Sequence, residues 1–443
     1  MEDAYSIHGG YPLKGEIQLS GAKNVSLKVI IASLLFESEV CIANVPRIKD
    51  IEELLHLITS LGGHARFTSQ NEVVVDKKGM SKNTINLLQA IKTRVSFMFF
   101  APLLHLFGSC RIPNPGGCRI GARPIDRQID IMKAMGVSVQ YDEEDGYYKA
   151  QLTTKKFQGI THRFEKRTHT GTEFGIMLGV LTQGKTIIEN ASLEPEIDDL
   201  IHFLEKGGAQ IARKGDSIII SGVSHLTQHK KYSILYDRNE AVTHALLAIA
   251  TKGDITVHGV GEADIVAFLQ KVKEAGGGVA AQEKSIRFFY RGELAATQAE
   301  TAPHPGFMTD WQAPWAVLMT QARGISTIHE TVFENRFAYV EELRKLGAQI
   351  EFFRPEVKDS ATLYQFNIKK MEECFFQGIK IHGPSLLHNA VLTVSDLRAG
   401  ASLLIAASIA NGQTIVYGAS VIDRGYEHID TKLKSVGARI QRI

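Results

Sequence analysis

Charge excess, cysteine and long apolar runs are all scarce in this sequence, and each scarcity excludes a class of protein. Lys and Arg number 50 against 48 Asp and Glu residues, so no global field attracts nucleic acid or an anionic membrane. The longest apolar stretch, 95–107, is shorter than the ~18–20 residues that a membrane span requires. The first residues, MEDAYSIHGG, lack the apolar core of a signal peptide. An anion must therefore be bound by a local arrangement of residues.

Only four cysteines are present, Cys41, Cys110, Cys118 and Cys374, and no two of them form a CxxC pair. Such isolated thiols argue against a disulfide framework or a zinc knuckle, and they are typical of a reduced compartment. We therefore expect a cytoplasmic protein.

One pattern recurs along the chain: a helix with an apolar face, a glycine step and a short alternating strand. The six glycines are Gly62, Gly136, Gly208, Gly276, Gly347 and Gly437. They recur about every 70 residues, except that the last step is longer and contains the insertion 354–383. The length of 443 residues also exceeds one ordinary core. We therefore expect two domains of three repeats each.

The physics of this pattern is coherent. Apolar residues at i, i+3, i+4 and i+7 predict one buried helix face, and the glycine supplies the left-handed residue that ends the helix. The alternating strand that follows buries one of its faces. Further strand-like runs, EVVVD, SIIIS, ITVHG and TIVYG, complete the units. Because the repeated helices are strongly apolar, we expect them to lie inside walls of strands in an α/β fold.

Two motifs match functional patterns but stand in an unsuitable context. Residues 179–186 fit the GxxxxGK[ST] pattern of a phosphate-binding P-loop, which requires a strand before it and a helix after it. Here a helix-like segment, 172–181, precedes the pattern and a strand, 186–190, follows, so we expect a helix end with a glycine cap. His225 and His229 have i,i+4 spacing but no third ligand nearby, so we expect them to be solvated.

The most informative stretch is residues 113–124, PNPGGCRIGARP. Its prolines and glycines predict a loop, in which Cys118 lies between Arg119 and Arg123. Neighbouring guanidinium groups lower the pKa of a thiol and favour the reactive thiolate. The alternative for an isolated cysteine is a small buried apolar residue, which the polar, glycine-rich surroundings disfavour. We therefore expect Cys118 to be reactive.

Four further segments combine charged residues with turn or helix signals: GAKN at 21–24, TDWQ at 309–312, FENRF at 333–337 and SDLR at 395–398. The first lies between a strand and a helix, which places its lysine near a helix N-terminus, where anions bind. The second has one carboxylate among neutral residues, and the last two each place an arginine beside an acidic residue. Taken singly, each is better explained as a surface salt bridge or a helix cap.

Taken together, the motifs match a family. The chain resembles the enolpyruvyl transferases, and within them the UDP-N-acetylglucosamine 1-carboxyvinyltransferases, from Gly9 to the C-terminus. The matching motifs are LSGAKN, PGGCRIGARP, ENASLEPEIDDL, MTDWQ, HETVFENRF, SDLRAGASLLIA and DRGYEHI, in the expected order. The sister shikimate-pathway enzymes share the six-unit fold, but the cysteine loop and HETVFENRF point away from them. The resemblance implies an inside-out α/β barrel fold, with one domain of residues 21–235, a second of residues 1–20 plus 236–443, and an active site in the interdomain cleft that closes during catalysis.

The resemblance also implies the roles of the reacting residues. Lys23, Arg123 and Arg398 would bind the phosphate and carboxylate of phosphoenolpyruvate, groups that suit bidentate arginine. Cys118 would protonate the vinyl methylene and would also be able to add covalently to the substrate, while Asp310 would accept the proton of the attacking sugar hydroxyl. Addition would give a phosphorylated tetrahedral ketal, which then loses phosphate. No metal or cofactor is implied, because the arginines and Lys23 stabilise the charge.

The remaining implied residues surround the acceptor or support the anion site. They are Asn24, which would position the sugar; Arg94, Arg123, Pro124, Ile125, Asp126, Arg127, Lys166, Thr168, His169 and Val332, which would surround the uridine diphosphate; and Arg336 and Asp396, which would support the anion site. The expected partners are therefore small molecules, phosphoenolpyruvate and UDP-N-acetylglucosamine, and neither nucleic acid nor a membrane.

The nucleotide site departs from the family pattern. Where the family has SVGATE, residues 168–173 read THTGTE, and where it has VDLH after GARP, residues 125–128 read IDRQ. The family's PDRIE is YDRNE at 236–240. Lys166 is retained and suits a diphosphate, so we favour UDP-N-acetylglucosamine as the acceptor. Two alternatives stay open: enolpyruvyl transfer to another uridine nucleotide such as UMP, as in nucleoside-antibiotic pathways, and a repeat-built binding protein without activity.

We predict that fosfomycin, an epoxide phosphonate that mimics the anion of phosphoenolpyruvate, alkylates Cys118, because this thiol lies in a PGGC loop beside Arg123. Mass spectrometry should show a single adduct on the loop peptide, formed faster when nucleotide is present. Cys118→Asp should retain activity, since a carboxylic acid can also donate the proton, and should abolish labelling. An adduct on Cys41, Cys110 or Cys374 instead would contradict the assignment.

Overall fold

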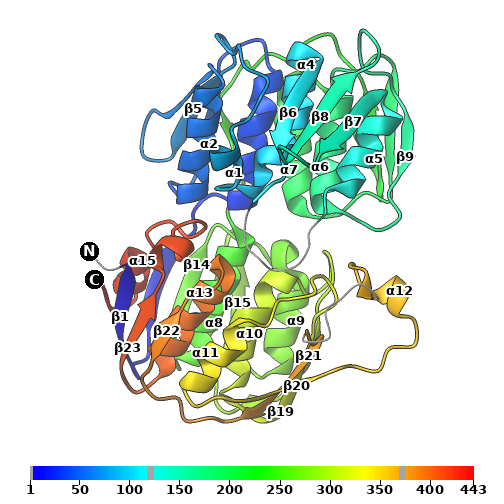
Figure 1. The fold of residues 1–443 in the computed structure, drawn as a ribbon. Helices are drawn as coiled ribbons and strands as arrows, with labels where there is room; N and C mark the ends of the chain where they lie inside the picture. The colour runs from blue at the N-terminus through cyan, green and yellow to red at the C-terminus, as the bar shows by residue number, and fades with distance from the viewer. Residues whose placement is uncertain (1–2, 117–123, 369–374) are drawn as a thin grey trace. The chain divides into compact units, whose positions relative to one another are not determined.

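The computed structural model describes residues 3–116, 124–368 and 375–443. The described residues form two compact units. Unit 1 contains residues 3–20, 236–368 and 375–443, and unit 2 contains residues 21–116 and 124–235. Within the described ranges, the chain passes from one unit to the other after Ser20 and again after Leu235 (Figure 1).

The elements of unit 2 follow one another in a repeated order of central helix, strand, second helix and two strands. They are α1 (Lys23–Ala32), η1 (Ser33–Leu35), β3 (Val40–Ala43), α2 (Lys49–Ser60), β4 (His64–Phe67), β5 (Glu72–Asp76), α3 (Leu87–Ala90), η2 (Arg94–Phe99), α4 (Phe100–Phe107), β6 (Ser109–Pro113), α5 (Asp126–Ala134), β7 (Val137–Asp142), β8 (Tyr147–Leu152), β9 (Thr161–Arg163), α6 (His169–Gly179), β10 (Lys185–Glu189), α7 (Pro195–Lys206), β11 (Gln210–Lys214), β12 (Ser217–Ser221) and β13 (Tyr232–Ser233).

Unit 1 repeats the same order. Its elements are β1 (Ala4–Gly9), β2 (Lys14–Gln18), α8 (Arg238–Ala250), β14 (Asp254–His258), η3 (Glu262–Ile265), α9 (Val266–Glu274), β15 (Gly278–Gln282), β16 (Ser285–Phe289), β17 (Leu294–Ala295), β18 (Gln298–Glu300), η4 (Thr309–Trp311), α10 (Gln312–Met319), β19 (Ala322–His329), α11 (Tyr339–Lys345), β20 (Gln349–Phe353), α12 (Ser360–Leu363), β21 (Gly378–Gly383), β22 (Val391–Thr393), α13 (Leu397–Ile409), β23 (Gly412–Tyr417), α14 (Ala419–Ile422), α15 (Ile429–Ser435) and β24 (Arg439–Arg442).

The strands form small sheets, one for each repeat. The strand orders are β13-β3-β5-β4, β6-β8-β7 and β11-β12-β10-β9 in unit 2, and β15-β16-β14-β2, β17-β19-β21-β20 and β22-β23-β1-β24 in unit 1. The last strand before each crossing belongs to a sheet of the unit that the chain is leaving. β2, which precedes α1, pairs in parallel with β14 of unit 1. β13, which precedes α8, pairs in parallel with β3 of unit 2.

The six predicted glycine steps are confirmed. Gly62, Gly136, Gly208, Gly276, Gly347 and Gly437 have φ angles of +97°, +87°, +101°, +82°, +99° and +97°. Each follows the end of a helix and precedes a strand, because a residue without a Cβ adopts the left-handed conformation at little cost. The repeat inferred from the sequence is therefore a repeat of structure.

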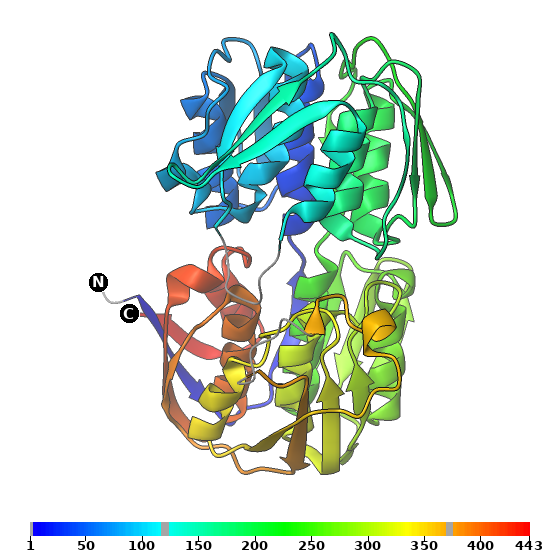
Figure 2. The ribbon, with the colours of Figure 1, turned by 45° about the vertical axis from the view of Figure 1, so that its right-hand side comes forward.

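The expectation that the repeated helices lie inside walls of strands is wrong. The repeated helices are amphipathic and half-exposed: α2, for example, buries a stripe through Ile51, Leu54 and Ile58 and exposes the opposite face. The enclosed helices form a different set, in which α8 and α10 are buried along their whole length and α13 nearly so. These three helices pack against one another with the sheets outside them (Figures 1 and 2). In unit 2 the corresponding helices are α1, α4 and α6.

The structure agrees with the analysis of the two unsuitable motifs. Residues 179–186 lie between the end of α6 and the start of β10, the reverse of a P-loop, and Gly184 has a left-handed φ of +87°. His225 and His229 are both exposed. Residues 179–186 therefore lack the structural context of a P-loop.

Two of the helix-ending glycines make a matched pair for a stability test. A Cβ on Gly62 would lie 2.5 Å from the carbonyl oxygen of Gly79, whereas a Cβ on Gly208 would meet nothing within 4 Å. We expect Gly208→Ala to lower the free energy of unfolding by about 1–2 kcal/mol, the cost of the left-handed conformation. Gly62→Ala should lower it by clearly more, because Gly79 must also move. Urea denaturation of both variants checks this, and equal losses would contradict it.

Candidate functional site

A carboxylate of unit 1 lies between two buried arginines. Asp310 lies in η4, directly before α10, and Arg398 lies in the first turn of α13. Arg336 Nη2 donates a hydrogen bond of 2.7 Å to Asp310 Oδ1, and Arg398 Nε lies 3.8 Å from Oδ2. The arginine side chains are only 6% and 7% exposed. The residues next to Asp310 in the sequence are neutral, whereas its neighbours in space include the cationic side chains of Arg336 and Arg398.

The alternative of surface salt bridges is wrong for these arginines, because both are buried. Their partners are also distant in the sequence, since Arg398 lies near Asp237 and Asp310. Asp396, two residues before Arg398, acts instead as a helix cap. Its Oδ1 accepts hydrogen bonds from the backbone N–H groups of Arg398 at 3.0 Å and Ala399 at 3.1 Å. Asp396 thereby fixes the first turn that carries Arg398.

Asp237 is a candidate that the sequence analysis missed. Its Oδ1 caps α8 by accepting from Asn239 N at 2.8 Å, and its Oδ2 lies 3.8 Å from Arg398 Nη2. Burial raises the pKa of Asp237, although Arg398 opposes this shift. The ring of Tyr426 lies 5.1 Å from the Arg398 guanidinium carbon. An acidic residue immediately before an apolar helix was the available signal for Asp237.

Glu330 is a second missed residue, and it connects two parts of the candidate site. Its buried carboxylate accepts from Thr309 Oγ1 at 2.8 Å and from Gln312 Nε2 on one oxygen. The other oxygen accepts from the backbone N–H groups of Val332 at 2.7 Å and Phe333 at 3.0 Å. Burial raises the pKa of Glu330 despite these donors and the nearby Arg336. Glu330 therefore ties the turn that carries Asp310 to the segment that carries Val332.

In unit 2, Lys23 is the first residue of α1, as expected for a residue near a helix N-terminus. Its Nζ lies 2.8 Å from Asp50 Oδ2, and both side chains are buried. Asp50 belongs to the first turn of α2. Asn24, the next residue of α1, is partly buried. The lysine that the sequence analysis assigned to a substrate anion therefore has a resident carboxylate partner.

The residues assigned to the diphosphate lie at the start of α6. Thr168 caps this helix, and its Oγ1 accepts a hydrogen bond of 3.2 Å from Gly171 N. Arg127, on α5, donates from Nη1 to the carbonyl oxygen of Arg167 at 3.5 Å. Burial lowers the pKa of Arg127, partly offset by nearby carboxylates. The structure thus brings Arg127 and the segment that follows Lys166 together.

Arg94 begins η2, and residues 124–126 lead into α5. The charges of Asp126 and Arg94 both act on the phenol of Tyr148, whose pKa is raised mainly by burial. These residues therefore share one neighbourhood of unit 2.

Cys118 and Arg123 lie outside the described residues. Of the cysteines inside them, Cys110 is buried and Cys41 partly so. Burial raises the pKa of both thiols, which disfavours the nucleophilic thiolate. Neither is therefore suited to attack an electrophile.

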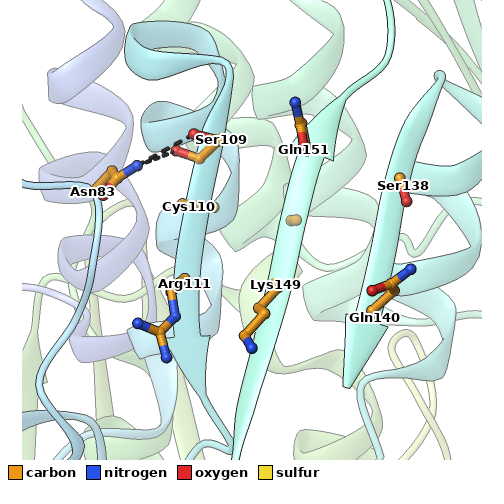
Figure 3. A pocket seen from close by; sticks show the side chains of 9 residues that line it. Asn83, Ser109, Cys110, Arg111, Ser138, Gln140, Lys149 and Gln151 are labelled. Atoms are coloured by element: carbon orange, nitrogen blue, oxygen red, sulfur yellow. Dashed lines mark hydrogen bonds between the residues drawn. The ribbon is translucent and has the colours of Figure 1, made fainter. Parts of the chain in front are cut away.

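A hollow of about 360 Å³ lies on the sheet β6-β8-β7 (Figure 3). Its lining residues are Asn83, Ser109, Cys110, Arg111, Ser138, Gln140, Lys149, Ala150 and Gln151, none of which belongs to the site inferred from the sequence. The exposed cations at its edge are paired, Arg111 with Asp145 at 2.5 Å and Lys149 with Asp142. We assign no chemistry to this hollow.

Within the described ranges, no helix is both long and apolar enough to cross a membrane. The same ranges contain no group of three His, Cys, Asp or Glu side chains arranged to hold a metal ion.

Comparisons with known proteins agree with this architecture. The enolpyruvyl transferase NikO from Streptomyces tendae has a TM-score of 0.85 at 21% identity, covering 100% of this chain and 99% of that one. The EPSP synthase from Acinetobacter baumannii has a TM-score of 0.71 at 14% identity, covering 99% of this chain and 100% of that one. The predicted fold class is therefore confirmed.

Sequence relatives extend over the full length. A UDP-N-acetylglucosamine 1-carboxyvinyltransferase from Bdellovibrio bacteriovorus is 38% identical over 99% of both chains. One from Idiomarina loihiensis is 37% identical over 100% of this chain and 99% of its own. The family model for EPSP synthase (3-phosphoshikimate 1-carboxyvinyltransferase) matches residues 7–433. From its fold, its full-length relatives and this match, the chain belongs to the EPSP synthase (3-phosphoshikimate 1-carboxyvinyltransferase) family.

Proposed function

We propose that the protein transfers the enolpyruvyl group of phosphoenolpyruvate to the 3'-hydroxyl of UDP-N-acetylglucosamine with release of phosphate. This reaction is the first committed step of peptidoglycan precursor synthesis. Full-length relatives with the corresponding name support the proposal. The structural observation that carries it is the partly exposed carboxylate of Asp310 held between the buried arginines Arg336 and Arg398.

Asp310 accepts the proton of the attacking sugar hydroxyl. Two guanidinium groups stabilise its ionised form, which is the form that accepts a proton. The hydrogen bond from Arg336 is to Oδ1, and Oδ2 faces Arg398 Nε at 3.8 Å.

Arg398 and Lys23 bind the anionic groups of phosphoenolpyruvate, together with Arg123. Burial alone would lower the pKa of Arg398. Tyr426 and Asp237 outweigh this effect and raise the pKa above its ordinary value, so the guanidinium stays charged. Such preorganised charges stabilise the anionic ketal without a metal. Cys118 donates the proton to the vinyl methylene.

Transfer to another uridine nucleotide, such as UMP, is the second candidate. The altered residues 168–173 at the start of α6 favour it, because they depart from the family pattern at the diphosphate position. Lys166 and Arg127 favour the diphosphate.

A phosphate-release assay with phosphoenolpyruvate and either UDP-N-acetylglucosamine or UMP tests the proposal. Release with the first acceptor and little with the second is expected. Release with UMP alone would remove the peptidoglycan role and leave the chemistry, and release with neither would favour a binding protein without activity.

We expect Asp310→Ala and Arg398→Ala to impair catalysis in different ways. Loss of the proton acceptor should lower kcat by about 10²-fold or more, whereas loss of an anion ligand should mainly raise the KM for phosphoenolpyruvate. Steady-state kinetics at varied phosphoenolpyruvate checks both. Arg323→Ala is a matched control, because Arg323 is an exposed arginine of the same unit paired with Glu293. Equal, small effects from Asp310→Ala and Arg398→Ala would contradict the assignment.

A further inference from the structure

A buried chain of charges connects two central helices of unit 2. Glu173, on α6, is completely buried. One of its oxygens, Oε2, lies 3.2 Å from Lys28 Nζ on α1, and the other, Oε1, lies 3.1 Å from His169 Nε2 at the start of α6. The side chain of Lys28 is 5% exposed and that of His169 is 22% exposed. The chain of charges thus runs from the core to a partly exposed imidazole.

We propose that His169 is a phosphate-binding residue held by Glu173, which makes the protein prefer a nucleoside diphosphate to a monophosphate in a manner that depends on pH. This inference rests on the proposed function in one respect, that the acceptor is a uridine nucleotide.

The two ring nitrogens of His169 have different surroundings. Nε2 is buried and lies 3.1 Å from Glu173 Oε1, a charge contact rather than a hydrogen bond of good geometry, and the negative charge of the carboxylate favours a proton on Nε2. Among the described residues, Nδ1 has no hydrogen-bond partner, and the His169 side chain as a whole is 22% exposed. In the neutral ring Nδ1 is an acceptor, which repels a phosphate oxygen, and in the imidazolium Nδ1 is a cationic donor. Protonation therefore decides whether His169 binds or repels an anion.

The charges that face His169 come from three elements. Glu173 lies on its own helix, Glu194 precedes α7, and Lys28 comes from α1. From α5, the neutral amide of Gln128 contacts Thr170, the next residue of α6. Burial and Lys28 disfavour the imidazolium, but the two carboxylates outweigh them and raise the pKa of His169. The imidazolium thus persists to a higher pH than that of an exposed histidine.

The position of His169 suits a phosphate group. It is the first residue of α6, where the positive end of the helix dipole favours anions. Arg127 approaches the same end of the helix through its hydrogen bond to the carbonyl of Arg167, and Lys166 lies two residues before the helix cap Thr168 in the sequence. The second phosphate of a nucleoside diphosphate gains a charged donor from His169. The single phosphate of a monophosphate does not reach His169 when it occupies the position of the first phosphate.

Glu173 is a positioning residue in this arrangement. One of its carboxylate oxygens faces Nε2 of the ring and stabilises the charge of the imidazolium, and the other lies beside Lys28. Removing Glu173 should therefore reduce the protonated fraction of His169 at a given pH without removing the imidazole.

Calorimetric titration with UDP-N-acetylglucosamine and with UMP from pH 6 to 9 tests the proposal without requiring turnover. The wild-type affinity for UDP-N-acetylglucosamine should fall by about tenfold as His169 loses its proton, the size expected for one hydrogen bond to a charged group. His169→Gln should bind this ligand about tenfold more weakly at low pH and should show no such fall. The affinity for UMP should be nearly the same in both proteins at each pH. His225→Gln is the matched control, because His225 is an exposed histidine of the same unit.

Glu173→Gln should move the fall in affinity to lower pH. Because this variant leaves Lys28 buried without its partner, the double variant Lys28→Met, Glu173→Gln provides the same test without an unpaired buried charge. A merely structural role for Glu173 would lower affinity equally at every pH.

The outcomes separate this inference from the proposed function. If wild type and His169→Gln bind UDP-N-acetylglucosamine with the same affinity and pH profile, the inference is overturned while the function stands. If His169→Gln weakens UMP as much as UDP-N-acetylglucosamine, the preference for a diphosphate is overturned. If the wild type binds neither nucleotide, the proposed function and this inference fail together.

Discussion

Each unit encloses three helices on all sides, and the candidate site depends on how the N-terminal ends of these helices are satisfied. The first-turn N–H groups of a helix have no acceptor within the helix, and burial keeps water from supplying one. Asp237 and Asp396 accept these bonds in unit 1, and Thr168 does so in unit 2. A side chain used in this way has a fixed direction, so the charged residues that contact it are fixed as well. Arg398, which lies between its own helix cap and Asp237, shows this most clearly.

Buried charge in both units is balanced by charge of the opposite sign. Lys23 has Asp50, and Arg336 has Asp310. Such pairs are costly to break, because the remaining partner is left uncompensated in a medium of low dielectric constant. A substrate anion that approaches Lys23 or Arg398 therefore joins an existing ion pair. The anion is attracted by the net positive charge that remains after the nearby carboxylates have neutralised part of the cationic charge. This arrangement favours a ligand with several negative charges over a singly charged one.

The sequence predicted local features well and spatial partners poorly. The glycine steps, the strand runs and the start of α1 at Lys23 follow from signals within a few residues. The enclosed helices escaped notice because a helix that is apolar on every side has no amphipathic periodicity to detect. Asp310 was placed among neutral neighbours, and its contacts with Arg336 and Arg398 come from segments 26 and 88 positions away. Asp237 and Glu330 were missed for the same reason, since their partners are defined only by the tertiary fold.

The two crossings between units have a consequence for how the chain can be divided. The described residues of unit 2 lie between positions 21 and 235, and the two ends of this segment lie together, with Ala22 N donating to Leu235 O at 2.9 Å. Outside this segment, Asp237 N donates to Ser20 O at 2.9 Å. Because β2 and β13 join the sheets of the units that they leave, cutting the chain at these two neighbouring points removes no described strand from its sheet. The molecule can therefore be dissected into two polypeptides, one of them closed by a short link from residue 20 to residue 236, with the sheets of each part complete.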